Sequence, residues 1–394
     1  MGEQKDFFKE HLAQTTPFPF RIKVEKAEGS YIYDKDGKAY LDLVSGIAVS
    51  ALGHGHPRIL AAIKKQSEKH LHVMVYGEFE QDAQNELAQE LLKTVPTSIN
   101  SFYFVNSGTE AIEAALKLGK RVTGKQEIIA FDNAYHGSTH GSLSLSSNPI
   151  KKAPFEPLLP NIKHIELNNF DHLDQISRNT ACVILETIQG DAGVRLPKEG
   201  YLKALRNKCD ETHTLLIFDE IQCGMGRTGK MWAFEHYNVV PDLLVAGKAL
   251  GGGMPIGCVM ANRKLMLQFS ENPMLGHITT FGGHPLVCAT AAEGLKIIND
   301  ESLIEGIAAK ASLFKEFLQH TAIKEIRQKG LMIAVELEDE EKVQQVVLKG
   351  LENGIILFWF LSTPNAFRLS PPLNISEEEI KEGCIKIIDL LNDL

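Results

Sequence analysis

The chain has 394 residues, of which 44% are hydrophobic and 23% charged, as is typical of a soluble enzyme with one large domain and additions to it. Its formal net charge of -9 argues against a nucleic-acid-binding surface, and no basic run offsets that charge. No apolar run is long enough for a membrane helix, and the polar, acid-containing stretch 1–14 does not resemble a secretory signal. We therefore expect a cytoplasmic protein that binds neither membranes nor nucleic acids.

The N-terminal third predicts short elements of mixed type. Strands separated by turns are expected over residues 22–45, where Asp36-Gly37 marks a hairpin. Apolar residues then follow helical spacing at 57–70 and at 80–93. These elements precede a change of pattern near residue 100.

From about residue 100 onward, short apolar runs alternate with helical stretches. The runs are SFYFV, EIIAF, ACVILE, TLLIFDE, DLLVAGK and IGCVMA. Near-continuous apolar strands are buried on both faces, which predicts a largely parallel sheet covered by helices.

The last part of the chain predicts a second, smaller unit. Residues 285–320 are helical in pattern, and 323–394 combine the strands MIAVELE and IILFWF with a closing amphipathic helix. We therefore predict an α/β protein with an N-terminal segment at 1–50, a large cofactor-binding α/β domain at 51–288 and a small C-terminal α+β domain at 289–394.

Polar residues stand where the run SFYFV ends, and a helix starts immediately after them. Gly108 allows the backbone to approach a ligand closely, while Ser107 and Thr109 place hydroxyls beside the free N–H groups of the helix start. This arrangement suits a phosphate, although the same residues are also typical of a plain helix cap. The glycine motifs of nucleotide-binding loops are absent from the sequence.

Charged residues end two further apolar runs. Asp219 and Glu220 close TLLIFDE, where a buried carboxylate needs a cationic partner, such as a protonated ring nitrogen or a structural ion pair. Lys248 closes DLLVAG, where desolvation lowers the pKa of its amine and makes the neutral nucleophile available. The three glycines at 251–253 are expected to make room for a bulky group.

A phosphate cradle, a buried acid and a desolvated lysine on neighbouring strand ends are the parts that pyridoxal 5'-phosphate needs. The acid would keep the pyridine nitrogen protonated, and the lysine would form a Schiff base and later move a proton. The sequence therefore predicts this cofactor before any family is considered.

The resemblance to a known family rests on segments spread along nearly the whole chain. They are GIAVSALGHGHP (46–57), FVNSGTEAIEAALKLGKRVTG (104–124), AYHG (134–137), ETIQGDAG (186–193), LLIFDEIQCGMGRTGK (215–230), PDLLVAGKALGGGMPIG (241–257), TTFGGHPLVCA (279–289) and FRLSPPL (367–373). The sequence resembles the class III, ornithine/acetylornithine-type aminotransferases of pyridoxal-phosphate fold type I. DEIQxGxGRTG with GKALGGGxPIG at this spacing is highly specific.

The resemblance implies roles for residues around the cofactor. Lys248 would be the Schiff-base lysine and Asp219 the partner of the pyridine nitrogen, so these two are the predicted catalytic residues. The other implied cofactor-binding residues are Ser107, Gly108 and Thr109 at the phosphate, Tyr135 and Ile221 on the two ring faces, Gln222 at the phenolic oxygen, His136, Glu186 and Thr280. Thr280 would reach the phosphate of the neighbouring subunit, which implies a homodimer with shared active sites.

The implied substrate residues are Arg368, Asp191 and Ser138. Arg368 would bind a substrate carboxylate, and family members carry a glutamate at the Asp191 position that pairs with this arginine when an ω-amine substrate is bound. Asp191 is one methylene shorter, which weakens this gate. Ser138 stands where members that bind a second carboxylate usually carry arginine, which argues against 2-oxoglutarate and ornithine-like compounds unless another cation compensates.

We therefore expect transfer of the ω-amino group of N-acetylornithine, or a similar amino donor, to a keto acid such as 2-oxoglutarate. The alternatives are a transaminase for other ω-amines that uses pyruvate, an aminomutase or decarboxylase on the same fold, and a non-catalytic binding protein. No metal site is expected, because the His136/His140 spacing lacks the glutamate of a zinc motif. Tyr76 and Glu78 are expected at the substrate entrance, and Trp359-Phe360 in the core.

Overall fold

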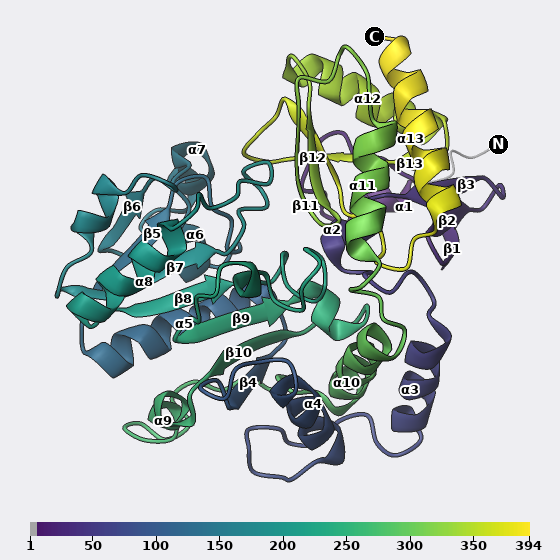
Figure 1. Ribbon diagram of the computed structural model, residues 1–394. Coiled ribbons are helices and arrows are strands. Elements are labelled where there is room, and N and C mark those ends of the chain that lie inside the picture. Colours follow the sequence, from purple (N-terminus) through teal and green to yellow (C-terminus); the bar gives the residue numbers. More distant parts are fainter. Residues whose placement is uncertain (1–5) are drawn as a thin grey trace.

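The computed structural model describes residues 6–394, so the first five residues of the predicted N-terminal segment and of the polar stretch 1–14 lie outside it. Two lobes are visible in Figure 1, and the N-terminal strands (purple) lie beside the C-terminal helices (yellow) in the upper lobe. In the described part of the chain, no helix is long and apolar enough to cross a membrane. All six cysteines are buried and unpaired.

The lower lobe is built on a seven-stranded sheet with the order β4-β10-β9-β8-β7-β5-β6 (Figure 1). The strands are β4 (Ser101–Val105), β5 (Glu127–Phe131), β6 (Ile162–Ile165), β7 (Thr180–Glu186), β8 (Leu215–Asp219), β9 (Leu243–Gly247) and β10 (Gly257–Ala261). The neighbours β9-β8-β7-β5-β6 pair in parallel, whereas β10 is antiparallel to both β4 and β9. The prediction of a largely parallel α/β sheet is confirmed.

Helices cover both faces of this sheet. Alternate residues of a strand point to opposite faces, so Ile217 joins the cluster under α5 (Gly108–Thr123), while Leu216 and Phe218 join the cluster under α8 (Tyr201–Thr212). Both faces are therefore buried, which explains why the strands read as unbroken apolar runs.

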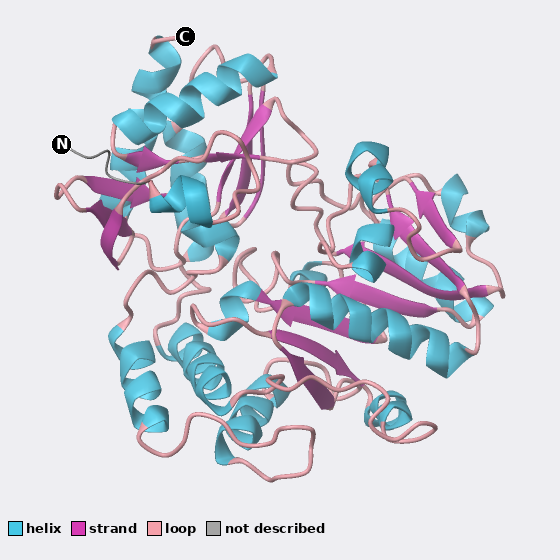
Figure 2. Ribbon diagram, turned by 180° about the vertical axis from the view of Figure 1, so that it is seen from behind, coloured by secondary structure: helices cyan, strands magenta, loops and turns pink. Residues whose placement is uncertain are grey.

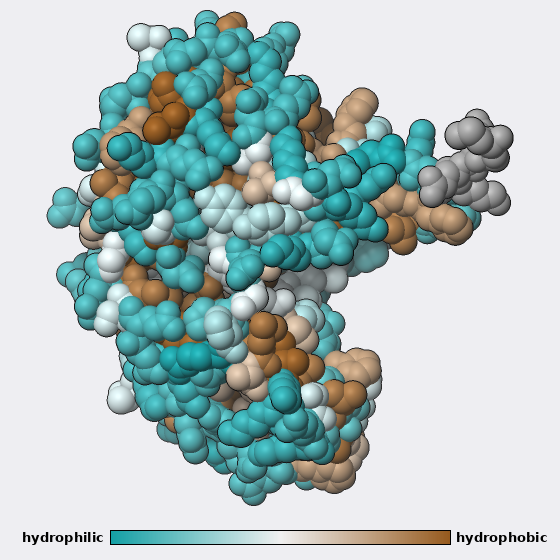
Figure 3. Space-filling model, turned by 90° about the vertical axis from the view of Figure 1, so that its right-hand side faces the viewer, coloured by the Kyte–Doolittle hydropathy of each residue, from teal (hydrophilic) through white to brown (hydrophobic). Residues whose placement is uncertain are grey.

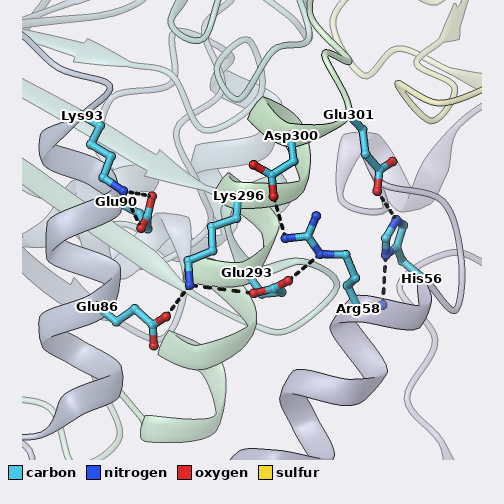
Figure 4. A network of polar contacts seen from close by, with 9 residues as sticks. All are labelled: His56, Arg58, Glu86, Glu90, Lys93, Glu293, Lys296, Asp300 and Glu301. Carbon is cyan, nitrogen blue, oxygen red and sulfur yellow. Dashed lines mark hydrogen bonds and ion pairs between the residues drawn. The ribbon is translucent and has the colours of Figure 1, made fainter.

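Three helices form a separate layer beside β4 and the turn that follows β9. These helices are α3 (Pro57–Ser67), α4 (Asp82–Leu92) and α10 (Pro285–Asp300). Figure 4 shows the ion pairs that join them: Arg58 pairs with Glu293 at 2.6 Å and with Asp300 at 2.9 Å, and Lys296 pairs with Glu86. These partners are partly exposed, so each pair contributes only about 0–1 kcal/mol and the apolar contacts carry the packing.

The upper lobe combines both ends of the chain. Its four-stranded sheet has the order β11-β12-β15-β14 and is covered by helices, as Figure 2 shows from behind. The elements are α11 (Ile307–Phe317), β11 (Glu325–Lys329), β12 (Met332–Glu336), α12 (Glu340–Glu352), β13 (Ile355–Ile356), β14 (Phe358–Trp359), β15 (Ala366–Leu369) and α13 (Glu377–Asn392). The smaller α+β unit of the predicted fold class is therefore present.

The N-terminal strands β1 (Val24–Glu28), β2 (Tyr31–Asp34) and β3 (Ala39–Asp42) form a second four-stranded sheet with β13, which pairs in parallel with β3. The predicted hairpin at Asp36-Gly37 is confirmed: Gly37 has a φ of 83°, and Asp34 accepts hydrogen bonds from the N–H groups of Asp36 and Lys38. Helix α10 runs through the predicted boundary at 288/289, and the domain limits at 50/51 and 288/289 stay predictions.

The remaining elements are short. They are α1 (Phe7–His11), α2 (Ser45–Ala48), α6 (His140–Ser144), α7 (Pro149–Lys152), α9 (Arg263–Met266) and the 3₁₀ turns Ala153–Phe155, Asp171–Gln175, Ala233–His236, Lys248–Gly251 and Leu267–Phe269.

Candidate active site

A cavity of about 280 Å³ opens at the carboxyl edge of the large sheet, where ligands of α/β proteins bind. It is lined by Gly108, Thr109, Tyr135, His136, Gly137, Ser138, Glu186, Ile188, Asp219, Ile221, Gln222, Cys223 and Lys248. The ends of β4, β7, β8 and β9 thus bring most of the predicted site residues together. Ile188, Cys223 and Gly137 also line it and were not predicted, although each lies within a segment that carried the resemblance.

Lys248 begins a 3₁₀ turn directly after β9, with a φ of 45°. Burial lowers the pKa of its amine because the charged form loses hydration, and the positive charge of Arg368 lowers it further. Asp219, Glu186 and Asp191 oppose this shift, but the net direction is downward. This shift favours the neutral, nucleophilic form of the amine, in the direction that the sequence predicts.

The three glycines after Lys248 do not make room for a ligand, so that expectation is wrong. A Cβ on Gly252 would lie 2.9 Å from Ile59 Cδ1 and 3.1 Å from the carbonyl oxygen of Thr290, and one on Gly251 would lie 3.2 Å from Ile256. Gly252 lets this turn pack closely against α3 and α10, and none of the three glycines lines the cavity.

Asp219 ends β8 and bonds to His136, whose Nδ1 lies 2.7 Å from Asp219 Oδ2. Burial disfavours a charged imidazole, but the hydrogen bond and negative charge of Asp219 outweigh it and raise the pKa of His136. The other oxygen of Asp219 accepts the N–H of Ile221 at 3.0 Å. The Nε2 atom of His136 is buried without a hydrogen-bond partner among the described residues, which marks an unfilled polar position at this end of the cavity.

Two buried glutamates flank Asp219 and differ in role. Glu186 lines the cavity and accepts the N–H groups of Tyr135 and Gly190 at 3.2 and 3.0 Å, and burial raises its pKa to about 7. Glu220 faces away, accepting the N–H groups of Ala233 and Phe234 and the Thr187 hydroxyl. It therefore caps a structural turn. The structural alternative that the sequence left open, an ion pair, is not formed by Glu220 among the described residues.

The polar turn before α5 is both a helix cap and a cradle. Ser107 caps α5 by accepting the N–H of Glu110 at 3.3 Å, so it supports the cradle from outside the cavity. A Cβ on Gly108 would lie 2.7 Å from Ile221 Cδ1, so only glycine leaves this approach open. The Thr109 hydroxyl belongs to a cluster with Thr139 and Ser142, and α5 is long enough to present a polarised N-terminus.

Asp191 and Arg368 form a buried ion pair, with 2.9 Å between Asp191 Oδ1 and Arg368 Nη2. The shorter side chain of Asp191 therefore reaches the arginine. The Arg368 guanidinium also lies 4.4 Å from the centre of the Phe360 ring, so Phe360 is more than a core residue. Ser138 lines the cavity, and among the described residues that line it none is an arginine.

Neither Asp191 nor Arg368 lines this cavity, and two further groups of predicted residues lie away from it. Thr280 is exposed and does not line it, so within one subunit it is not brought to the site. Tyr76 and Glu78 line a different cavity of about 800 Å³, formed by β4, α4 and the loop 263–282.

The residues present fit pyridoxal phosphate. The cavity has the size of a small ligand site, a Cβ on Gly108 would collide with Ile221 in its lining, and the buried Asp219 and the desolvated Lys248 line it as well.

A family profile described as "Aminotransferase class-III" matches residues 13–391 of this chain. The chain belongs to the class III aminotransferases. An acetylornithine aminotransferase of Methanopyrus kandleri is 38% identical over 388 residues, 97% of each chain, and ornithine aminotransferase 1 of Staphylococcus aureus is 39% identical, covering 92% of this chain and 93% of its own. This class III aminotransferase therefore uses pyridoxal phosphate to transfer amino groups.

The fold of this aminotransferase has close counterparts among solved structures. The ornithine aminotransferase of Toxoplasma gondii superimposes with a TM-score of 0.91 at 31% identity, over 98% of this chain and 93% of the other. The predicted family, fold type I and cofactor class are confirmed.

Proposed function

We propose that this aminotransferase moves the ω-amino group of N-acetylornithine, or of a close N-acylated relative, to a keto acid such as 2-oxoglutarate. The carrying observation is the closed Asp191–Arg368 pair beside Lys248. While Asp191 neutralises Arg368, a donor can bind with its uncharged carbon chain and ω-amine toward Lys248. When Arg368 is released, it can hold the carboxylate of a keto acid. Relatives named acetylornithine and ornithine aminotransferases support this substrate class.

We propose the following division of work among the residues of this chain. Bound pyridoxal phosphate supplies the ring that stores the electron pair released when the donor loses a proton. Lys248 would hold the cofactor through its amine, whose pKa is lowered by burial, and would accept and return the proton that the donor loses. Asp219, positioned by His136 and by the N–H of Ile221, keeps the ring nitrogen protonated.

The other roles concern binding. We propose that Ile221 and Tyr135 pack on the two ring faces, that Gln222 bonds the phenolic oxygen, and that Glu186 fixes the loops on either side of the ring. Gly108 and Thr109, supported by Ser107, hold the phosphate through the N-terminus of α5. The hydroxyl of Ser138 lies 3.4 Å from that of Tyr135. We propose that this Ser138 hydroxyl forms a hydrogen bond with a neutral acyl group of the substrate.

We further propose a cytoplasmic homodimer in which Thr280 completes the phosphate site of the partner subunit. The 800 Å³ cavity beside β4 is bordered by exposed apolar side chains, including Met274, Leu275 and Ile278. Figure 3 shows apolar surface gathered on the lower half of the face seen there. Apolar patches of this kind are typical of subunit contacts.

The test of the reaction is a spectrum. Addition of N-acetylornithine without any keto acid should shift the visible absorption of the bound cofactor, and later addition of 2-oxoglutarate should restore it. An unchanged spectrum would show that N-acetylornithine is not the donor. It would favour the second candidate function, a transaminase for other ω-amines, which Ser138 also favours.

The test of the lysine is chemical. Borohydride should fix the cofactor to a peptide that contains Lys248, and Lys248→Ala should abolish this label. Lys230→Ala, which removes an exposed lysine, should label as the wild type does. A label that persists in Lys248→Ala would contradict the assignment.

A further inference from the structure

Three hydroxyl groups meet at the start of α5. The Oγ1 atom of Thr109 lies 2.7 Å from Ser142 Oγ and 2.8 Å from Thr139 Oγ1, and the last two atoms are 2.9 Å apart. Thr109 lines the cavity of the candidate site, whereas Thr139 and Ser142 do not, and Ser142 is 1% exposed. Ser142 therefore contacts Thr109 without reaching the cavity itself.

The protons of these hydroxyls can be placed from their neighbours, since each hydroxyl has one proton to donate. Thr139 donates its proton to the carboxylate of Glu113. The Oε1 atom of Glu113 also accepts the N–H of Ser142 at 3.0 Å, which holds α6 against α5. Because the Thr139 proton is committed to Glu113, Ser142 is the hydroxyl left, among the described residues, to donate to Thr109.

An anion at the start of α5 changes where Thr109 directs its own proton. Without an anion, this proton can go to Thr139 Oγ1 at 2.8 Å. When a phosphate accepts it instead, Thr109 Oγ1 is left as an acceptor, with the Ser142 hydroxyl at 2.7 Å and the Thr139 N–H at 3.4 Å. Ser142 is the nearer and better donor. A hydroxyl that accepts a hydrogen bond becomes a stronger donor itself, because the chain of hydrogen bonds polarises.

We propose that Ser142 is a positioning residue for the phosphate of the cofactor and that it acts through Thr109. The Ser142 proton goes to Thr109 Oγ1, and the Thr109 proton is thereby directed at the phosphate. Ser142 itself touches neither the cofactor nor the substrate. This inference deepens the proposed function and rests on its assignment of Thr109 to the phosphate.

The experiment compares pyridoxal phosphate with pyridoxal, which lacks the phosphate but keeps the ring and the aldehyde. Fluorescence titration of the apoenzyme gives the affinity for each compound. In Ser142→Ala we expect pyridoxal phosphate to bind about five-fold more weakly, because one hydrogen bond is lost from a chain that ends on a charged group. The affinity for pyridoxal should stay within about two-fold. Ser142→Cys, which fills the same space with a weak donor, should show the same selective loss.

Two further variants make the result specific. Ser144→Ala removes another buried hydroxyl of α6, which donates to the carbonyl oxygen of His140, and should leave both affinities unchanged. Thr109→Val removes the hydroxyl through which Ser142 is proposed to act. On this background, Ser142→Ala should cause no further loss of affinity for pyridoxal phosphate, because residues that act through one another are not additive.

The inference is overturned if Ser142→Ala leaves the affinity for pyridoxal phosphate unchanged or weakens both compounds equally. It is also overturned by an additive loss on the Thr109→Val background. Failure of the proposed function looks different. If Thr109→Val alone binds pyridoxal phosphate as the wild type does, the phosphate does not lie at Thr109, and the inference falls with that assignment. If only the proposed donor is wrong, the wild-type spectrum does not respond to N-acetylornithine, while the two titrations still report on Ser142.

Discussion

Asp219 and Glu220 are adjacent in the sequence and both buried, yet their partners give them different work. Asp219 points to the cavity with His136, whereas Glu220 accepts two hydrogen bonds from the turn at Ala233–His236 and one from the Thr187 hydroxyl. The residues themselves do not reveal this difference, because both are acids at the end of a buried strand. Only the direction of each side chain separates a cofactor contact from a structural cap.

Asp219→Asn should therefore lower kcat/KM by about 10²–10³-fold, since a neutral amide cannot stabilise a protonated ring nitrogen. Steady-state kinetics with N-acetylornithine and 2-oxoglutarate measures this loss. The matched variant Glu220→Gln should cost stability more than activity. A loss of activity equal in the two variants would contradict the role proposed for Asp219.

Glu220 should also give the protein a measurable pH dependence. Burial raises its pKa to about 7 in the folded protein, against an ordinary value of 4.5. Its contribution to the free energy of unfolding is therefore complete below pH 4.5, where the carboxyl is protonated in both states, and is lost as the pH rises through 7. We expect the fall in Tm of the apoenzyme between pH 5 and pH 8 to be smaller in Glu220→Gln than in the wild type. Parallel Tm curves would show that Glu220 does not titrate in this range.

At the scale of elements, the strands and helices that pack on one core were the most predictable. The apolar runs of β4, β5 and β7–β10 reflect burial on both faces, and burial is what a sequence pattern reports. Direction is not encoded in that pattern, so the reversal of β10 was not foreseen. The strands β6 and β11 were missed because IKHI and EIRQK carry polar residues at the sheet edges.

The residues of the candidate site also divide into those that local sequence predicts and those that it does not. The cradle at 107–109, Asp219 and Lys248 follow from strand ends and glycine placement, and the other cofactor contacts followed only from the family resemblance. The contact of Ser142 with Thr109 was not predictable, because it joins two helices across 33 residues through side-chain geometry. Of the misread glycines at 251–253, Gly252 packs against α3 and α10, two helices that the local sequence does not name.

The start of α5 offers a test at this scale. In Gly108→Ala, the new Cβ would meet Ile221 Cδ1 at 2.7 Å and push the side chain proposed to pack on the ring. Overpacking of this kind costs about 1–3 kcal/mol, so the affinity for pyridoxal phosphate should fall by roughly ten-fold or more. Fluorescence titration of the apoenzyme with the cofactor gives this value.

The control is Gly294→Ala in the middle of α10, where a Cβ would make ordinary contacts of 3.6 Å with Leu52. It should raise helix stability by up to about 1 kcal/mol and leave cofactor affinity unchanged. If both variants bind the cofactor as the wild type does, Gly108 is not part of the cradle.

At the scale of the whole molecule, the apolar surface beside β4 predicts that the isolated subunit is incomplete. Phe281 is 54% exposed and follows Thr280 directly. We expect Phe281→Glu to shift the protein from dimer to monomer in sedimentation velocity, because a charge cannot be buried cheaply in a subunit contact. Activity should fall with the dimer, since Thr280 would then no longer reach the partner's site.

Leu348→Glu provides the comparison. Leu348 is 50% exposed on α12, in the upper lobe and away from this surface. This variant should remain dimeric and active. If the Phe281→Glu protein remained dimeric, this surface would not form the subunit contact.

The reversal of β10 has a consequence for local motion. Because β10 runs back along β9, with Gly257 paired opposite Gly247, the stretch 248–256 is a closed connection between two central strands. Lys248 therefore follows the paired end of β9 directly, and the connection that it begins returns to β9 through β10. We expect the backbone amides of β9 and β10 to exchange with solvent deuterium only through global unfolding. On this account, global unfolding would release the cofactor proposed to be held by Lys248 together with the loss of the core.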